Sequence, residues 1–137
     1  MKEIIQDLEK LKAEYDKKLL LDIVERYNEV VKNDDMNPTV YYESVGFLIE
    51  RYEDGEFTIN DFLDECKFIC RDYDYLLTKM RDEDMELKYR TQAYNMLVSP
   101  LLLLQVVFIV KQDYKTLGGF LGRKRNRMFD KAMGVLQ

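Results

Sequence analysis

The sequence predicts an all-α protein, a bundle of five to six helices around one buried apolar helix at about 94–110. That stretch has no polar side, and a helix of this kind has to be surrounded by other helices. Over most of the remaining chain, apolar residues recur at steps of three and four, which is the helical period. Only six glycines and two prolines are present among 137 residues, which disfavours a loop-rich chain. We expect one domain, residues 1–137, with a single core.

The first expected element is a long amphipathic helix at about 2–32. Its apolar residues include Leu8, Leu19 and Val30, which are eleven residues apart. An eleven-residue repeat suits a nearly straight helix better than a left-handed coiled coil. At a rise of about 1.5 Å per residue this helix would be about 45 Å long. Because a bundle of this size does not cover such a length, its first turns are expected to meet a second copy, and a homo-oligomer is predicted.

The second helix is expected at about 38–53. Pro38 suits its first helical position, because the N–H that proline lacks would have no partner there. Asp54 and Gly55 end the helix, since glycine is common just beyond a helical C-terminus. The pattern therefore predicts two helices joined by a short turn.

The third helix is expected at about 59–81, and a capping box marks its start. Thr58 stands at the N-cap and Asp61 lies three residues further on, where each side chain can bond to the other residue's backbone N–H. The acidic residues 82–84 then suit the first turn of a fourth helix, because negative charge at this end complements the helix dipole.

The fourth segment leads into the apolar helix. Ser99 is expected to cap that helix, with Pro100 at its first position. The alternative is one long helix from about Glu83 that is kinked at Pro100. No membrane span is expected, because the run Leu101–Val110 has ten residues and includes Gln105, and extending it back to Tyr94 adds Asn95, Ser99 and Pro100. A bilayer requires about 20 predominantly apolar residues.

Charge is divided unevenly along the chain. Residues 111–137 carry seven Lys or Arg and two Asp, a net charge of +5, and the remainder carries 14 Lys or Arg and 24 acidic residues, a net charge of −10. An acidic body with a basic tail, here 118–137 with a final helix, attracts polyanions at one end only. A partner protein, nucleic acid, an anionic membrane or the protein's own acidic surface would all attract this tail. Its candidate binding residues are Arg123, Lys124, Arg125 and Arg127.

No catalytic residue, metal site or cofactor is expected, and the protein is predicted not to be an enzyme. The chain has no histidine, which removes imidazole bases and most transition-metal sites. Cys66 and Cys70 lie four residues apart on the apolar side of the third helix, where we expect them to be buried as small hydrophobic residues. Residues 50–61 would place Tyr52 at a ligand position of a calcium-binding loop, and tyrosine offers calcium no suitable oxygen.

These observations predict a small cytoplasmic interaction or regulatory protein that binds another macromolecule, in the first place another protein, through an acidic helical surface. The densely charged N-terminal stretch lacks the apolar segment of a signal peptide. Tyr42 and Tyr75 fall off the expected core positions and are candidates for an exposed interface, because tyrosine is enriched at interfaces. The alternative function is nucleic-acid binding through the basic tail.

Overall fold

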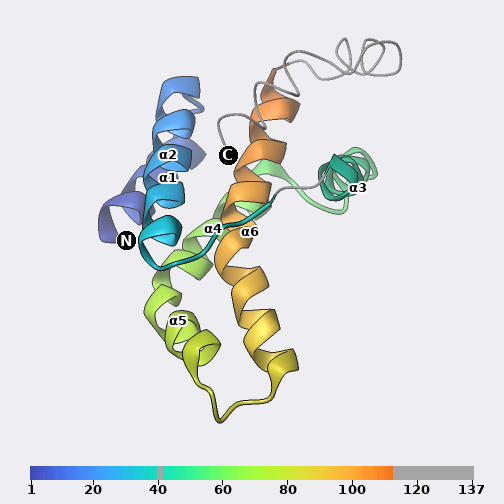
Figure 1. Ribbon diagram of the computed structural model, residues 1–137. Coiled ribbons are helices and arrows are strands. Elements are labelled where there is room, and N and C mark those ends of the chain that lie inside the picture. Colours follow the sequence, from blue (N-terminus) through green and yellow to red (C-terminus); the bar gives the residue numbers. More distant parts are fainter. Residues whose placement is uncertain (40–41, 113–137) are drawn as a thin grey trace.

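The computed structural model describes residues 1–39 and 42–112, and this part of the chain forms six α-helices (Figure 1). Helix α6 runs through the middle and packs against α2, α3, α4 and α5. The predicted all-α bundle around one apolar helix is confirmed. The predicted tail helix at 118–137 lies outside the described residues. The six helices are α1 (Lys2–Ala13), α2 (Lys17–Asn33), α3 (Tyr42–Glu53), α4 (Ile59–Arg71), α5 (Tyr73–Arg81) and α6 (Leu87–Lys111).

The two halves of helix α6 differ in how far their side chains are buried. In its first half, buried Ala93 and Leu97 are separated by half-buried Tyr94 and exposed Asn95 and Met96. From Pro100 to Val110, every residue except Leu102 is buried. A segment that is apolar on all sides is stabilised only when neighbours remove all of its sides from water. The other helices are therefore arranged around the C-terminal half of α6.

Pro100 lies inside α6, so the helix start expected at Ser99 and Pro100 is wrong and the single long helix is the better description. Proline has no N–H to donate to the carbonyl four residues earlier, which belongs to Met96. The Ser99 hydroxyl donates to that carbonyl at 2.9 Å. The Tyr27 hydroxyl, from α2, donates to the adjacent carbonyl of Leu97. The first of these bonds replaces the donor that the proline lacks, and the second ties α2 to α6 one residue further on.

By length and composition, α6 is the one helix within the described residues that could cross a membrane. An 18-residue window of it has a mean hydropathy of 2.0, and 56% of that window is buried inside the structure. The apolar stretch weighed from the sequence reaches back only to Tyr94, whereas α6 begins at Leu87 and has 25 residues. Because the core helix of a soluble bundle passes the same test, the absence of a span stays a prediction.

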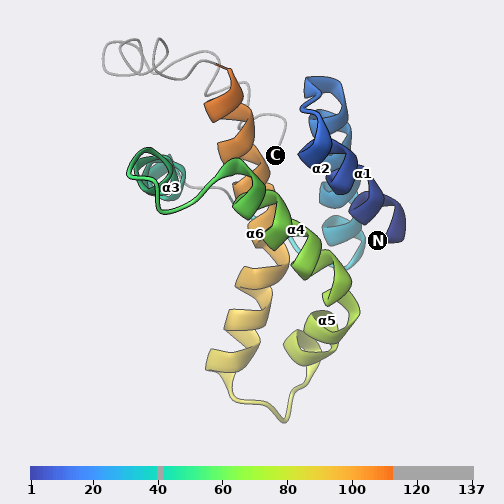
Figure 2. The same ribbon diagram turned by 180° about the vertical axis from the view of Figure 1, so that it is seen from behind.

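The long helix expected at about 2–32 is instead two helices, α1 and α2, packed side by side (Figures 1 and 2). Asp16 starts the second one, because its carboxylate accepts hydrogen bonds from the N–H groups of Lys18 at 2.9 Å and Leu19 at 3.3 Å. The apolar period continues across this turn, so periodicity alone did not reveal it. The 45 Å helix on which the homo-oligomer prediction depended is therefore absent, and the oligomeric state stays a prediction.

The expected third helix is divided at Asp72 into α4 and α5. Its predicted capping box is confirmed, with the Asp61 N–H donating to the Thr58 hydroxyl at 3.1 Å and the Thr58 N–H donating to Asp61 at 2.8 Å. Helix α4 crosses α6, and α5 then lies along the first half of α6 (Figure 2). The Tyr73 hydroxyl donates to the Asp34 carboxylate at 2.6 Å, which ties this junction to the end of α2.

The substitution Tyr27→Phe tests the hydrogen bond beside Pro100. Tyr27 is 1% exposed, so the change keeps the packing of the ring and removes the donor to the Leu97 carbonyl. We expect the free energy of unfolding to fall by about 1–3 kcal/mol, as measured by urea denaturation. The control Tyr75→Phe, at a tyrosine that is 66% exposed, should change it by less than about 0.5 kcal/mol. Equal effects of the two substitutions would contradict this role for Tyr27.

Candidate interaction surface

Of the site residues predicted from the sequence, Tyr42 and Tyr75 lie in the described part of the chain. Tyr42 is the first residue of α3, whereas Tyr75 lies on α5 and is 66% exposed. Helices α3 and α5 lie apart in the bundle (Figure 1), and a role of either tyrosine in an interface stays a prediction. The four cations of the basic tail lie outside the described residues: Arg123, Lys124, Arg125 and Arg127.

Helix α3 lies at the edge of the bundle, beside the C-terminal half of α6 (Figures 1 and 2). Its inward side carries Val45, which is fully buried, and Leu48 and Ile49, which pack partly buried against the core. Its outward side carries Phe47, whose exposed fraction is 54%. An aromatic ring that is more than half exposed on a peripheral helix is accessible to a partner.

The end of α3 is fixed by a glycine. Gly55 has a φ of +78°, a conformation that glycine adopts without the steric cost of a Cβ atom. The Gly55 N–H donates to the Tyr52 carbonyl at 3.1 Å, and the Glu56 N–H donates to the Arg51 carbonyl at 3.0 Å. These are the two bonds of a Schellman motif. Because the capping box of α4 follows directly, the connection that carries Phe57 is held at both ends.

Arg51 organises the aromatic side chains at this end of α3. Its guanidinium carbon lies 4.5 Å from the ring centroid of Phe47 and 5.8 Å from that of Phe57, and its Nε atom is 3.4 Å from the carboxylate of Glu56. Phe57 in turn packs on the buried ring of Phe62, with 5.8 Å between the centroids. Each cation–π contact at an exposed site contributes about 0.5–1 kcal/mol. Phe47 is therefore held in a defined position before any partner arrives.

The outward side of α3 is acidic. Over residues 43–65 the chain carries eight acidic residues and one basic residue, Arg51. Four exposed carboxylates lie close to Phe47 along α3 and its C-cap: Glu43, Glu50, Glu53 and Asp54. None of these four has an ion-pair partner within residues 1–39 and 42–112. We define the α3 surface as Glu43, Phe47, Glu50, Arg51, Glu53 and Asp54.

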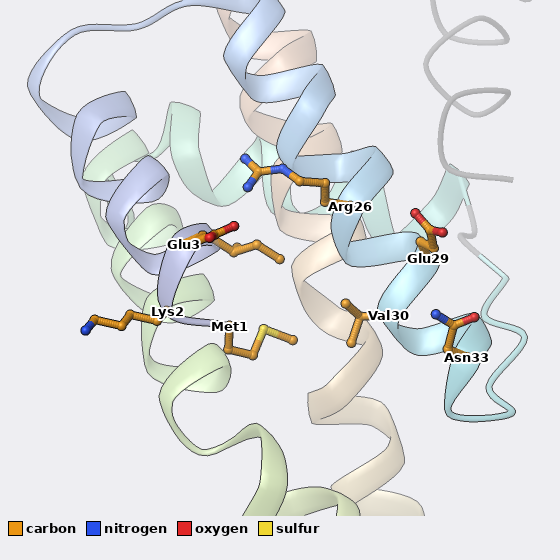
Figure 3. A pocket seen from close by; sticks show the side chains of 8 residues that line it. Met1, Lys2, Glu3, Arg26, Glu29, Val30 and Asn33 are labelled. Carbon is orange, nitrogen blue, oxygen red and sulfur yellow. The ribbon is translucent and has the colours of Figure 1, made fainter.

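A hollow of about 480 Å³ lies between the start of α1 and the second half of α2 (Figure 3). Charged side chains of both signs line it, and Arg26 already pairs with Asp7 at 2.5 Å and with Asp22 at 2.9 Å. In the described part of the chain, no group of three or more Cys, Asp or Glu side chains is arranged to hold a metal ion. The hollow is therefore a weaker candidate than the α3 surface. Its lining residues are Met1, Lys2, Glu3, Ile4, Arg26, Glu29, Val30 and Asn33.

The buried cation Lys67 joins α4 to α1. It is 8% exposed, and its ammonium group pairs with the carboxylate of Glu9. One turn away, Lys12 pairs with Asp64 at 2.6 Å. A buried charge is strongly unfavourable unless it is paired, and here the partners come from the neighbouring helix. This arrangement supports a structural role for Lys67.

Cys66 and Cys70 are both buried free thiols, as the sequence predicted. Burial raises the pKa of the Cys66 thiol and raises the pKa of the Cys70 thiol to about 11. The thiolate is the nucleophilic form of cysteine. At neutral pH both side chains therefore remain protonated, and neither is suited to nucleophilic chemistry.

No family model, no curated protein and no solved structure matches the chain. The α3 surface is therefore judged by its own geometry. Phe47 was not singled out from the sequence. A signal was present, because Phe47 is a large aromatic off the apolar stripe and lies four residues before Arg51, a spacing at which helical side chains meet.

The two thiols are expected to be unreactive in the folded protein. Iodoacetamide at neutral pH should modify neither Cys66 nor Cys70 in the time that it modifies both in urea, because burial keeps them protonated and inaccessible. Mass spectrometry of the intact chain gives the measurement. The variant Phe68→Cys, at a position on α4 that is 50% exposed, is the positive control. Rapid modification of Cys66 or Cys70 in the folded protein would contradict this assignment.

Buried neutral thiols and phenols make the fold sensitive to alkaline pH. Burial also raises the pKa of Tyr27 and of Tyr73, the latter helped by its hydrogen bond to Asp34. A group whose pKa is raised by folding gives stability that is complete below its unfolded pKa and is lost as pH rises toward its folded pKa. For Cys70 this window runs from 9.0 to about 11.

Over that window, we expect the contribution of Cys70 to the free energy of unfolding to fall by about 2–3 kcal/mol. Urea denaturation at a series of pH values measures the fall. Cys70→Ala should make the pH dependence shallower, whatever its effect at neutral pH. If the free energy of unfolding depends on pH equally in the natural protein and in Cys70→Ala, the Cys70 thiol is not the source of the loss of stability.

Proposed function

We propose that this protein is a small, non-enzymatic interaction protein whose α3 surface binds a basic segment of another protein. The observation that carries the proposal is the position of Phe47, which is 54% exposed among carboxylates that have no ion-pair partner in the described part of the chain. Interfaces concentrate their binding energy in a few aromatic or Arg side chains. Phe47, held by Arg51, has the character of such an anchor.

The chemistry of the α3 surface indicates what kind of segment it fits. Glu43, Phe47, Glu50 and Asp54 follow one another at steps of four, three and four, so they form a single stripe along the helix. Carboxylates on this stripe favour a cationic partner and oppose a phosphate backbone. Phe47 requires an apolar side chain opposite it. A basic amphipathic helix satisfies both requirements.

The absence of enzymatic activity is part of this proposal, and it is supported by the burial of the two thiols and by the pairing of the buried lysine. Cys66 and Cys70 are buried with raised pKa values. The buried cation Lys67 is engaged with Glu9. Neither kind of group is free to act as a nucleophile or a general base.

An amphipathic helical peptide with one leucine face and one lysine face is a suitable probe. Its affinity for the intact protein is measured by fluorescence anisotropy. Phe47→Ser should weaken binding about tenfold, which corresponds to about 1.4 kcal/mol, because the anchor is lost. A similar loss is expected from the quadruple variant Glu43→Gln, Glu50→Gln, Glu53→Gln and Asp54→Asn, because the attraction to lysine is lost.

A matched control separates the α3 surface from the overall charge. The quadruple variant Glu3→Gln, Glu14→Gln, Glu25→Gln and Glu29→Gln removes the same charge from exposed positions on and beside α1 and α2. It should weaken binding of the peptide by less than about threefold, since distant exposed charges are screened by salt. Equal losses in both quadruple variants would contradict binding at the α3 surface.

Nucleic-acid binding through the basic tail is the second candidate, favoured by the six cations and two acids of residues 113–137. A short DNA duplex used in place of the peptide decides between the two. Salt-sensitive binding of the duplex, abolished when Arg123, Lys124, Arg125 and Arg127 are changed to Gln and unaffected by Phe47→Ser, would overturn the proposal in favour of this function.

A further inference from the structure

We propose that the α3 surface is covered, in the free protein, by the basic C-terminal segment of the same chain, residues 113–137, which an external partner must displace. This inference rests on the proposed function, because it assigns a regulator to the same surface. The segment carries a net charge of +4. The α3 surface carries four carboxylates and one guanidinium group, and opposite charges of this size attract one another.

The place where α6 ends puts the segment within reach. Helix α6 ends at Lys111, with Gln112 as its C-cap, and its C-terminal half lies beside α3 in both views (Figures 1 and 2). The basic run 123–127 begins eleven residues after Gln112. Eleven residues extend to at most about 36 Å, and as a flexible chain they span about 18 Å on average. Helix α3, with 12 residues, is about 18 Å long. The linker to the basic run is therefore long enough to span the full length of α3.

The composition of the segment also matches the surface. Apolar residues flank the cations: Phe120, Leu121, Met128 and Phe129. The segment therefore offers both a positive charge for the carboxylates of α3 and an apolar side chain for Phe47. These are the two properties that the proposed function requires of a partner.

Covalent attachment makes even a weak contact effective. A segment tethered by a short linker has an effective concentration on the order of 1 mM. A dissociation constant of about 100 μM for the free segment would then leave the surface about 90% occupied in the intact chain. An external basic partner would bind about tenfold more weakly than it would without the segment, and raising the salt concentration would release the segment.

A tryptophan at position 47 reports on this contact, because the natural chain has none and Phe47 is exposed enough to accept the change. Phe47→Trp is placed in the intact chain, and quenching of its fluorescence by acrylamide measures its exposure. A second chain adds Arg123→Gln, Lys124→Gln, Arg125→Gln and Arg127→Gln. A third adds a matched set of changes at exposed lysines instead: Lys2→Gln, Lys10→Gln, Lys18→Gln and Lys88→Gln. Circular dichroism verifies that all three chains are folded.

The second chain, with the four tail substitutions, is called the tail-neutralised chain. At low salt, its acrylamide quenching constant should be about twofold higher than that of the other two chains. All three should converge at about 0.5 M salt, where screening removes the attraction. A synthetic peptide of residues 113–137, added to the tail-neutralised chain, should restore the protection. Equal quenching in all three chains at low salt would overturn the inference. Protection that disappears on dilution of the intact chain would also overturn it, because the segment would then come from a second copy.

The leucine–lysine peptide distinguishes this inference from the proposed function. If the tail-neutralised chain binds that peptide at the α3 surface but the intact chain shows no protection of the introduced indole, the inference fails and the proposed function stands. If the tail-neutralised chain does not bind the peptide at all, both fail. Binding to the intact chain that is about tenfold weaker than binding to the tail-neutralised chain supports both.

Discussion

The hydroxyl of Tyr27 reaches from α2 to the carbonyl of Leu97, just before Pro100 in α6. At this point an apolar helix passes through a residue that cannot continue its own hydrogen-bond ladder. Pro100 removes the donor that the Met96 carbonyl would otherwise have, and the Ser99 hydroxyl donates to that carbonyl instead. The Tyr27 hydroxyl adds a buried hydrogen bond to the neighbouring Leu97 carbonyl, so α2 is fixed to the core helix at the point where the proline interrupts the ladder.

Structural features that depend on residue type and on nearby residues in the chain were predicted correctly from the sequence. The apolar side of each helix, the buried thiols and the capping box at Thr58 all follow from residue type and spacing, and the structure contains them. The breaks at Asp16 and Asp72 were missed because the apolar period passes through both without interruption. At the first break the N–H groups of Lys18 and Leu19 donate to the Asp16 carboxylate, and beside the second the Tyr73 hydroxyl donates to Asp34. Periodicity carries no information about such bonds.

The candidate site was predictable only in its general character. An acidic helical surface followed from the charge distribution, but its location depends on where the bundle leaves a helix half covered. Helix α3 is that helix, because it lies at the edge beside α6 (Figure 1). Phe47 becomes an accessible anchor as a result of this placement, and Arg51 holds it by a contact at 4.5 Å. The same helix lies beside the C-terminal half of α6, and the basic segment follows α6 in the sequence.

The helices that form most of the core differ from the helix that carries the candidate interaction surface. Helices α1, α2, α4 and α6 bury the core and use their ion pairs internally, as Lys67 does with Glu9. Helix α3 contributes one fully buried residue, Val45, and the partly buried Leu48, Ile49 and Tyr52 to that core, and its carboxylates have no ion-pair partner in the described residues. If the proposed function holds, stability and recognition depend on different sides of the bundle, and changes on the outward side of α3 should leave the fold intact.

The most direct test of the central claim is a map of backbone amide chemical shifts, recorded by NMR while the leucine–lysine peptide is added to the tail-neutralised protein. Binding at the α3 surface predicts that the largest changes fall within residues 43–57, around Phe47 and Arg51. Changes confined to the hollow between α1 and α2, or to the region of Tyr75 on α5, would contradict it.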